Sequence, residues 1–236
     1  MLEPPHDCPL CPRLVEFRAA NREKFPAHFN APVPCFGPRD GRLLIAGLAP
    51  GLHGANATGR PFTGDWAGDL LYATLLKHGL ARGVYKERAD DGFELVDCRI
   101  VNAVRCVPPQ NKPEPSEIKM CRQFLTAEIG AMTNLRVILA LGKIAHDSVL
   151  KALEIRLAAH PFKHGAVYSI PLTMTGLEPV IHGKTRLDGR VKPAHGGKVI
   201  KLISSYHCSR YNTNTRVLTT RMFEDVVGLA KGLTGA

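Results

Sequence analysis

Residues 43–65 read LLIAGLAPGLHGANATGRPFTGD, a short apolar run followed by a long segment rich in glycine. The apolar residues 43–46 are typical of a strand in a buried parallel sheet. The nineteen residues 47–65 contain five glycines and two prolines, with almost no large apolar side chains. A turn alone needs far fewer residues. We therefore expect this strand to end in a functional loop.

The pattern of apolar run, loop and amphipathic segment recurs along the chain. Runs rich in Val, Ile and Leu predict four strands, at 42–49, 97–104, 135–141 and 199–206. Helical spacing predicts helices at 65–78, 115–130, 143–153 and 216–233. This alternation predicts an α/β fold with a central, mostly parallel four-stranded sheet. Functional loops of such a fold lie at the carboxyl ends of the strands, which places several polar loops on one rim.

The composition favours one domain spanning residues 1–236, because 236 residues with 44% hydrophobic content can form one sizeable core. Residues 175–198 are rich in Gly, Lys and Arg, lack an apolar period, and predict a flexible basic insertion. No run approaches the roughly 18 apolar residues of a membrane span, and the first residues do not resemble a signal peptide. We expect a cytoplasmic monomer. The formal net charge of +10 favours a polyanionic partner, although charge alone does not separate DNA, RNA and an anionic membrane.

The chain has seven cysteines, an odd number, and is expected to be cytoplasmic. Both features favour metal binding or catalysis over a disulfide framework. Cys8 and Cys11 form a C-x2-C motif whose thiolates can reach one metal centre, and Cys106 and Cys121 follow far downstream. Four thiolates would complete one site, but the downstream pair could also be small buried apolar residues. Spacing alone leaves zinc and an iron–sulfur cluster open. The remaining cysteines, Cys35, Cys98 and Cys208, are expected to serve ordinary packing.

Four blocks in this order resemble a known family: GLAPGLHGANATGRPFTGD (47–65), VNAVRCVPPQNKPEPSEIKMC (101–121), LALGKIAH (139–146) and SYHCSRYNTNT (205–215). They are similar to the type B (family 5) uracil-DNA glycosylases of the uracil-DNA glycosylase superfamily, over the chain from Cys8 to about Phe223. The resemblance implies a three-layer α/β/α sandwich, one 4Fe-4S cluster on Cys8, Cys11, Cys106 and Cys121, and removal of deaminated bases from DNA. Two features depart from the family pattern: the basic insertion, and Cys208 where the superfamily often has proline.

A base in duplex DNA must be flipped out before an enzyme can reach it, so the wall of its site must allow close backbone approach. Glycine allows that approach, and the substrate-binding floor is predicted at Gly47, Ala49, Pro50 and Gly51. A plain glycine-rich connector is the alternative. The resemblance suggests that Phe62 stacks on the flipped base, whereas a core aromatic is the alternative.

Three residues are predicted to be catalytic. Related families place an acidic or amide side chain at Leu48 or Ala49, so the resemblance leaves activation of water to another group. Asp65 could orient water and stabilise the cationic sugar, or it could cap a helix. Asn102 can read the carbonyl and imino edge of a uracil-like base, unless it serves a turn. His207 can stabilise the negative charge on the departing base.

The loop after the last predicted strand is polar, which suits contact with phosphates and insertion into the gap left by a flipped nucleotide. The predicted substrate-binding residues of this loop are Ser209, Arg210, Tyr211 and Asn212. A hydrogen-bonded turn is the alternative for the Ser and Asn residues. Arg105, His146 and Lys143 could reach phosphates from neighbouring strand ends.

Three functions remain open: a monofunctional DNA glycosylase, a non-catalytic iron–sulfur DNA-damage-binding protein, and an iron–sulfur redox protein. A glycosylase that uses water is favoured, because no lysine stands at a motif position to attack the sugar. The first motif of the family corresponds to GLAPG, residues 47–51. In glycosylases strict for uracil a bulky aromatic follows the proline of this motif, and the matching residue here is Gly51. We therefore expect excision of uracil and of bulkier bases such as hypoxanthine, ethenocytosine or thymine opposite guanine, which would initiate base excision repair.

Overall fold

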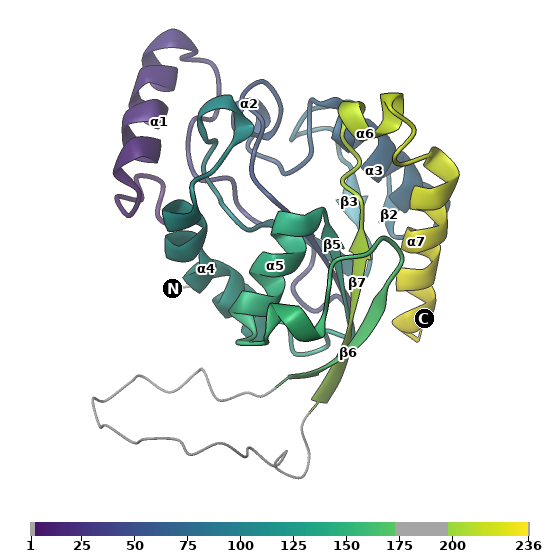
Figure 1. The fold of residues 1–236 in the computed structure, drawn as a ribbon. Helices are drawn as coiled ribbons and strands as arrows, with labels where there is room; N and C mark the ends of the chain where they lie inside the picture. The colour runs from purple at the N-terminus through teal and green to yellow at the C-terminus, as the bar shows by residue number, and fades with distance from the viewer. Residues whose placement is uncertain (1–2, 173–197, 236) are drawn as a thin grey trace, which may run out of the picture.

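A computed structural model of the chain describes residues 3–172 and 198–235. Its main sheet has five strands in the order β4-β1-β5-β7-β6 (Figure 1). The strands are β1 (Leu43–Gly47), β4 (Cys98–Asn102), β5 (Val137–Leu141), β6 (Val167–Leu172) and β7 (Lys198–Ser205). Neighbouring strands are parallel except for β6, which pairs with β7 in the antiparallel direction. The predicted α/β class and mostly parallel sheet are confirmed, but the sheet has five strands instead of four.

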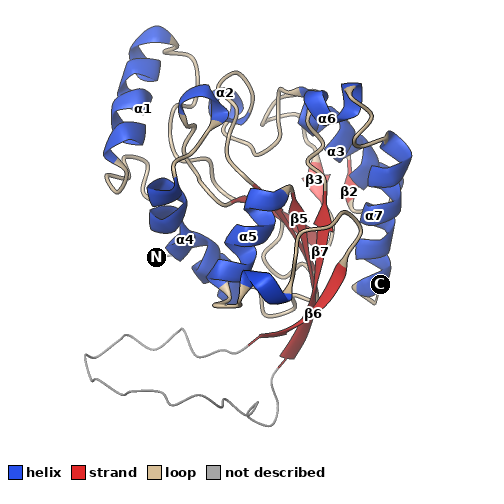
Figure 2. Cartoon of the chain, viewed as in Figure 1, coloured by secondary structure: helices blue, strands red, loops and turns tan. Residues whose placement is uncertain are grey.

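Helices cover both faces of the sheet and give the three predicted layers (Figure 2). One face packs against α3 (Trp66–Lys77) and α7 (Thr220–Leu233). The other face packs against α4 (Pro115–Ala131) and α5 (Lys143–Ala152). Because side chains alternate along a strand, Leu43 and Ile45 of β1 face the first pair, whereas Leu44 and Ala46 face the second.

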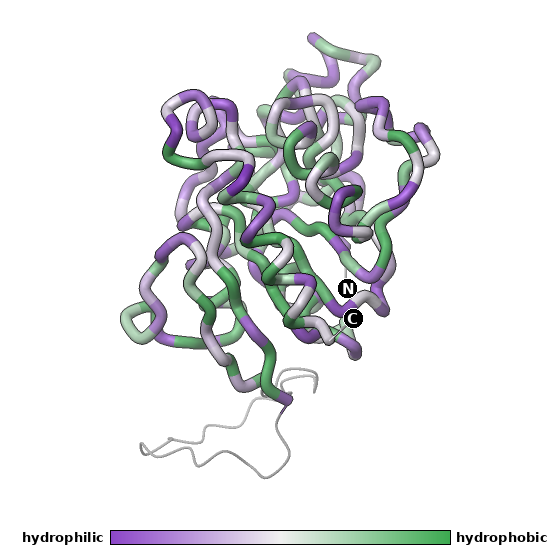
Figure 3. The backbone as a smooth tube through the Cα atoms, turned by 90° about the vertical axis from the view of Figure 1, so that its right-hand side faces the viewer, coloured by the Kyte–Doolittle hydropathy of each residue, from purple (hydrophilic) through white to green (hydrophobic). Residues whose placement is uncertain are grey.

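The core is buried on both sides of the central strands. Every residue of β1, β4 and β5 is buried, as the continuous apolar runs predict. Figure 3 shows hydrophobic stretches of backbone running through the middle of the molecule. Such burial fixes the strand ends rigidly, so the loops that leave them start from a stable platform.

Several short elements lie at the ends of the sheet. Helix α1 (Pro12–Lys24) follows the N-terminal segment and lies apart from the central strands, above α4 (Figure 1). The shorter ones are α2 (Ala55–Thr58), β2 (Ala81–Arg82), β3 (Glu94–Leu95) and α6 (Arg210–Asn214), with 3-10 turns at Pro109–Asn111 and Leu157–Ala159. Strands β2 and β3 form a separate two-stranded sheet. No described helix is long and apolar enough to cross a bilayer.

The predicted basic insertion at 175–198 lies outside the described residues except for Lys198, which begins β7. The strands that flank it are β6 and β7, and β6 pairs with β7 along its whole length, from Val167↔Ile203 to Leu172↔Lys198. The insertion therefore connects two paired strands at the end of the sheet opposite the carboxyl ends of β1, β4 and β5.

Candidate active site

The carboxyl ends of the parallel strands bring the predicted motifs together. Gly47, the last residue of β1, is the register partner of Asn102, the last residue of β4. Strand β5 ends at Leu141 and β7 ends at Ser205, just before His207. The loops that follow all four strands therefore start on the same edge, as the parallel topology predicts.

Gly47 lies in a crowded position where no side chain fits. A Cβ atom at this position would lie 2.5 Å from Oδ1 of Asn102 and 2.6 Å from Cζ of Phe62. Both distances are far below van der Waals contact. The glycine thus lets an amide from the neighbouring strand and an aromatic ring from the following loop approach the same backbone atom. The groups that approach this glycine are therefore side chains of the protein itself, and its predicted contact with a flipped base stays a prediction.

Asn102 carries an unsatisfied polar atom. Its side chain is 3% exposed, and its Oδ1 has no hydrogen-bond partner among the described residues. A buried amide oxygen without a partner costs free energy comparable to a lost hydrogen bond, so such atoms are rare in stable cores. An N–H donor from a bound molecule would satisfy it.

Phe62 and His207 pack ring against ring at this edge. Their centroids are 5.9 Å apart and their planes differ by 26°. Phe62 is buried and has a φ of 53°, a backbone conformation that a bulky residue rarely adopts. Burial lowers the pKa of His207 to about 4, so the imidazole is uncharged at neutral pH. A neutral imidazole offers one N–H donor.

Asp65 performs the capping role that the sequence allowed for. It is the N-cap of α3, and its Oδ1 accepts a hydrogen bond from the backbone N–H of Gly68 at 3.0 Å. Burial raises the pKa of Asp65, an effect that the hydrogen bonds from Gly68 and Ala67 partly offset. The other oxygen, Oδ2, faces the first-motif loop, 3.3 Å from where a Cβ on Gly51 would lie. One carboxylate therefore caps the helix and faces the glycine-rich loop at once.

The first motif is tied to the strand beside it through its backbone. The carbonyl groups of Gly47 and Leu48 accept hydrogen bonds from the N–H groups of Ala103 and Val104, at 3.0 and 2.9 Å. Pro50 is buried, and the carbonyl of Gly51 accepts a bond from Asn56. Ala49 packs against the cysteine cluster described below. The predicted floor, residues 47–51, is thus held by the segment that follows β4 and by the start of α2.

The loop after β7 is ordered by its own side chains. Ser209 caps α6, and the side-chain amide of Asn212 donates to the carbonyl of His207 at 2.8 Å. Both residues therefore have the turn-forming role that the sequence left open. Arg210 lies over the ring of Trp66 at 5.9 Å. Tyr211 is 75% exposed, so it is free to contact a large partner.

The four predicted metal ligands line one pocket. Cys8, Cys11, Cys106 and Cys121 surround it with apolar neighbours and with Arg18, whose Nη1 lies 3.6 Å from the sulfur of Cys106. Among the described residues, no three of these sulfur atoms lie within 4.8 Å of one another. Ligands of one tetrahedral zinc are about 3.8 Å apart, given Zn–S bonds of about 2.3 Å. The positions of the four sulfur atoms therefore do not outline a site for a single zinc ion.

The chemistry of the thiols also fits a metal centre. Burial raises the pKa of Cys106 to about 11 and that of Cys121 to about 12. Because burial favours neutral thiols, four thiolates here require positive charge between them, which a metal centre supplies. No disulfide joins these cysteines.

A second group of possible ligands has another explanation. Glu3, Cys35 and Glu128 present ligand atoms within 4.8 Å of one another. Glu128 pairs with Arg99 at 2.6 Å, and Glu3 pairs with Arg105. The two guanidinium groups already supply the positive charge that a cation would bring, so we assign this group to a buried ion-pair network.

Two of the proposed phosphate contacts are wrong. Arg105 is 1% exposed and pairs with Glu3, so it points away from solvent. His146 is fully buried between the carbonyl of His160 and the hydroxyl of Ser204, both at 2.8 Å. Only Lys143 is exposed, and it pairs with Asp147 of the same helix. The first two were misplaced because a strand-end position does not fix which way a side chain points.

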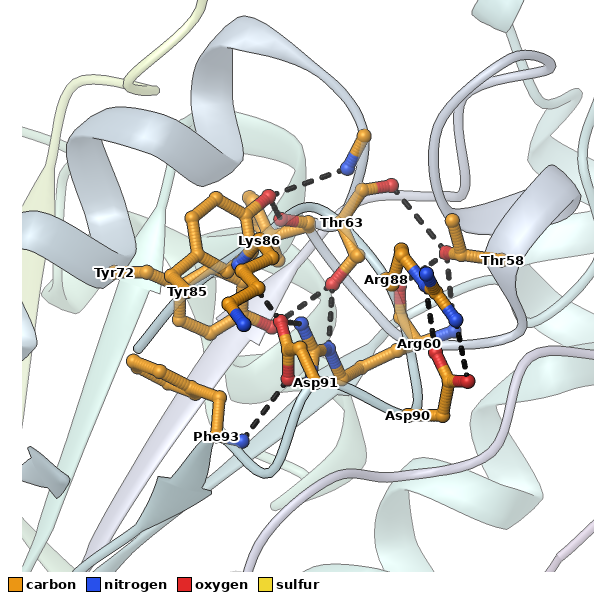
Figure 4. Close-up of polar contacts among 12 residues, drawn as sticks. Thr58, Arg60, Thr63, Tyr72, Tyr85, Lys86, Arg88, Asp90, Asp91 and Phe93 are labelled. Atoms are coloured by element: carbon orange, nitrogen blue, oxygen red, sulfur yellow. Dashed lines mark hydrogen bonds and ion pairs between the residues drawn. The ribbon is translucent and has the colours of Figure 1, made fainter. Parts of the chain in front are cut away.

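Sequence reasoning missed the residues that hold the loop between the first motif and Asp65. Arg60 is buried and pairs with Asp91, which lies far along the chain (Figure 4). Nothing in the sequence links the two, and each stands among polar residues that suggest a solvated loop. Trp66 was also missed, although it is an exposed aromatic directly after Asp65.

Comparison with known proteins extends these observations. A sequence model of the uracil DNA glycosylase superfamily matches residues 34–230. The chain is 40% identical to a type-5 uracil-DNA glycosylase of Thermus thermophilus over 97% of this chain and 94% of that protein. It is 34% identical to a type-5 uracil-DNA glycosylase of Pyrobaculum aerophilum over 97% and 90%. A type-4 uracil-DNA glycosylase of Archaeoglobus fulgidus is 29% identical over 58% of this chain and 62% of that protein.

Proposed function

Because the chain belongs to the uracil DNA glycosylase superfamily, and within it to the type-5 uracil-DNA glycosylases, we propose that it removes uracil from DNA by hydrolysing the N-glycosidic bond. The observation that carries the proposal is the unpartnered Oδ1 of buried Asn102, at the edge where Phe62 and His207 stack. The amide oxygen would accept the imino N–H of the base. The resulting abasic site would initiate base excision repair.

Recognition of the base would combine stacking with hydrogen bonding. Phe62 offers an aromatic ring for stacking, and the missing side chain of Gly47 lets this ring and the amide of Asn102 lie close to each other. Asn102 supplies the acceptor, and its Nδ2 can donate to a carbonyl of the base. The target nucleotide must leave the duplex to reach these groups. Flipping is cheapest for mismatched or single-stranded bases, which adds selectivity.

The chemical step would use the neutral imidazole of His207 and the carboxylate of Asp65 in complementary roles. As the bond from C1′ to the base nitrogen breaks, its electron pair moves onto the base, and the N–H of neutral His207 would stabilise that charge. The carboxylate of Asp65 would stabilise the cationic sugar and orient the water that attacks C1′. The water oxygen then bonds to C1′ and its proton leaves to the departing base or to solvent. No lysine intermediate is involved, so the enzyme is monofunctional.

We propose that Cys8, Cys11, Cys106 and Cys121 hold one 4Fe-4S cluster, which would supply a structural link rather than chemistry at the base. The C-x2-C motif precedes α1, and Cys121 lies on α4. Ala49 of the first motif packs against the same cluster of side chains. These cysteines would therefore brace the N-terminal segment and the predicted floor together.

Contact with DNA would use the exposed residues of the final loop. Arg210 and Tyr211 are exposed at the same edge as His207. A cation suits a phosphate, and an exposed aromatic ring suits the gap that a flipped nucleotide leaves. The net charge of +10 would strengthen the attraction to DNA and make binding sensitive to salt.

We also propose a broad substrate range, because Gly51 places no bulk after the first-motif proline. Hypoxanthine, ethenocytosine and thymine opposite guanine are the bulkier bases that such a site would admit. One extra methyl group is discriminated by only about 1–3 kcal/mol even where a wall exists. Discrimination would then depend on how easily each base leaves the helix.

The test is excision of uracil under single-turnover conditions. Protein in excess is mixed with a single-stranded oligonucleotide that carries one deoxyuridine, and hot alkali then cleaves the abasic product. We expect cleavage at the uracil, and none in a duplex that carries thymine opposite adenine at the same position, because that pair is costly to open. Binding of uracil-containing DNA without any abasic product would instead support the non-catalytic damage-binding alternative. Neither binding nor excision, with a reducible cluster, would favour the redox alternative.

A further inference from the structure

Arg60 and Asp91 form a buried ion pair behind the loop that carries Phe62. The guanidinium is bidentate, with Nη1 and Nη2 at 2.7 and 2.8 Å from the two oxygens of Asp91. The Arg60 side chain is 4% exposed and the Asp91 side chain is fully buried. The same carboxylate accepts the backbone N–H groups of Lys86 and Phe93, at 2.9 and 3.0 Å. These four donors hold the pKa of Asp91 far below its usual range, with Arg60 the largest cause.

Four aromatic rings enclose this guanidinium. Its central carbon lies 5.1 Å from the centroid of Phe36 and between 5.6 and 5.7 Å from those of Tyr72, Tyr85 and Phe93. Figure 4 shows the last three rings around Arg60 and Asp91. The faces of aromatic rings attract a cation, and the planar guanidinium matches both ring and carboxylate. A lysine could keep the charge but not the two-pronged geometry.

The surrounding groups form hydrogen bonds with all four residues between Arg60 and Asp65, including one from the hydroxyl of Tyr85 to the carbonyl of Phe62 at 3.5 Å. The Nε of Arg60 donates to the hydroxyl of Thr63 at 2.8 Å. The hydroxyl of Tyr72 donates to the carbonyl of Pro61, and the N–H of Gly64 donates to the hydroxyl of Tyr85 at 3.2 Å. The side chain of Phe62 points instead toward Gly47 and His207.

Phe62 needs such support because its backbone is held in the left-handed region, with φ at 53°. The loop also presses on the first turn of α3, where a Cβ on Gly68 would lie 1.8 Å from the carbonyl oxygen of Phe62. A bulky residue adopts this backbone conformation only when its neighbours enforce it. The groups that contact its neighbours in the chain are those gathered around Arg60.

We propose that Arg60, held by Asp91 inside the aromatic box, is a positioning residue that sets the place of Phe62 against a bound base. The expected effect on the rate of uracil excision rests on the proposed function. Arg60 contacts neither substrate nor reacting atoms and acts through Phe62. A small displacement of a positioning group can cost up to about a hundredfold in rate.

The experiment compares Arg60→Lys with a matched control, Arg42→Lys. Arg42 also forms a two-pronged ion pair, with Asp97, but at the amino ends of β1 and β4. Each variant is assayed by single-turnover excision of uracil and by binding to a thymine oligonucleotide. We expect Arg60→Lys to slow excision by about tenfold to a hundredfold with binding within about twofold, and Arg42→Lys to change neither.

A double-mutant cycle separates positioning from general stability. If Arg60 acts through Phe62, Arg60→Lys should slow excision by less than about threefold in a Phe62→Ala background. A full effect in that background, or an equal effect of Arg42→Lys, would overturn the proposal. Asp91→Asn should reproduce the behaviour of Arg60→Lys if the two residues act as a pair, and an unchanged rate would count against it.

Hydrogen exchange provides a readout that does not depend on activity. Peptides covering residues 60–66 should exchange faster in Arg60→Lys than in wild type or Arg42→Lys, because the anchor of the loop is weakened. Unchanged exchange in this segment would refute the anchoring role even if excision slowed. A wild-type protein that failed to excise uracil would refute the proposed function alone, and the exchange result would still decide whether Arg60 holds the loop.

Discussion

The ring of Phe62 stacks against the ring of His207, with centroids 5.9 Å apart, although the two residues come from loops that are far apart in the sequence. This contact joins the residue proposed to stack on the base to the residue proposed to stabilise its departure. Neighbouring groups hold the backbone beside each ring: Arg60 binds Thr63 next to Phe62, and the Asn212 amide binds the carbonyl of His207. The two roles are therefore coupled through one packing contact.

Replacement of His207 tests the stabilisation of the leaving base. His207→Ala should slow single-turnover excision of uracil by about a hundredfold to a thousandfold, the cost of losing one preorganised donor. His207→Gln keeps an N–H donor and should lose less. A folded His207→Ala protein with the wild-type rate would remove histidine from the mechanism.

The dependence on pH follows from the pKa of His207. Burial lowers it from 6.5 to about 4, so the unfolded chain binds the proton more readily between these values. Stability contributed by neutral His207 is thus complete above pH 6.5 and is lost as the pH falls toward about 4. The melting temperature of wild type should fall more steeply over this range than that of His207→Ala. The excision rate should show no inflection near pH 6.5, and a clear break there would contradict a neutral imidazole.

Asp65 serves as helix cap and proposed catalytic carboxylate, and two substitutions separate these roles. Asn is as good an N-cap as Asp, so Asp65→Asn should keep the melting temperature while slowing excision sharply. Asp65→Ala should slow excision and also lose about 1 kcal/mol of stability. Wild-type excision by Asp65→Asn would leave only the capping role. Because burial raises the pKa of Asp65 above 3.8, activity should also fall at a higher pH than for an ordinary aspartate.

The central sheet and half of the site could be predicted from the sequence because both depend on local patterns. Strands β1, β4 and β5 are buried along their length and so appear as continuous apolar runs. Strand β6 was missed because it alternates between exposed and buried residues and contains Pro171, as an edge strand can. Helix α1 was missed because only three of its residues are buried, and two of them are polar.

The support of the site could not be predicted because it depends on contacts distant in the chain. Gly47 and Asn102 end neighbouring parallel strands, so topology alone brings them together. No pairing of strands brings Arg60 and Asp91 together in the same way. A charged residue in a polar segment normally suggests a solvated surface, so neither residue was expected to be buried. Burial of this pair reflects tertiary packing, which no local pattern records.

The cysteine cluster makes a prediction about the purified protein. Protein prepared without oxygen from iron-replete cells should be brown and contain about four irons per chain, as a 4Fe-4S cluster requires. Cys106→Ser should lose iron, whereas Cys98→Ala should keep it, because Cys98 is buried in a different part of the core from the four proposed ligands. Stoichiometric zinc in a colourless protein would contradict the cluster.

Gly51 provides the test of substrate range. A Cβ atom on Gly51 would lie 3.3 Å from Oδ2 of Asp65, so any side chain there presses on the proposed catalytic carboxylate. A tyrosine would add bulk beside the base as well. Gly51→Ala is therefore the matched control, since it makes the contact with Asp65 but adds no bulk.

We expect wild type to excise uracil and at least one bulkier base, with mismatched pairs processed faster than matched pairs because flipping them costs less. Gly51→Ala should slow excision of all bases by a similar factor, because the effect on Asp65 does not depend on the base. Gly51→Tyr should keep some excision of uracil while losing the bulkier bases, through steric exclusion. The measurement is the ratio of single-turnover rates for uracil and for hypoxanthine, ethenocytosine or thymine opposite guanine. Wild type that excises only uracil, or equal ratios in Gly51→Ala and Gly51→Tyr, would show that Gly51 does not set the substrate range.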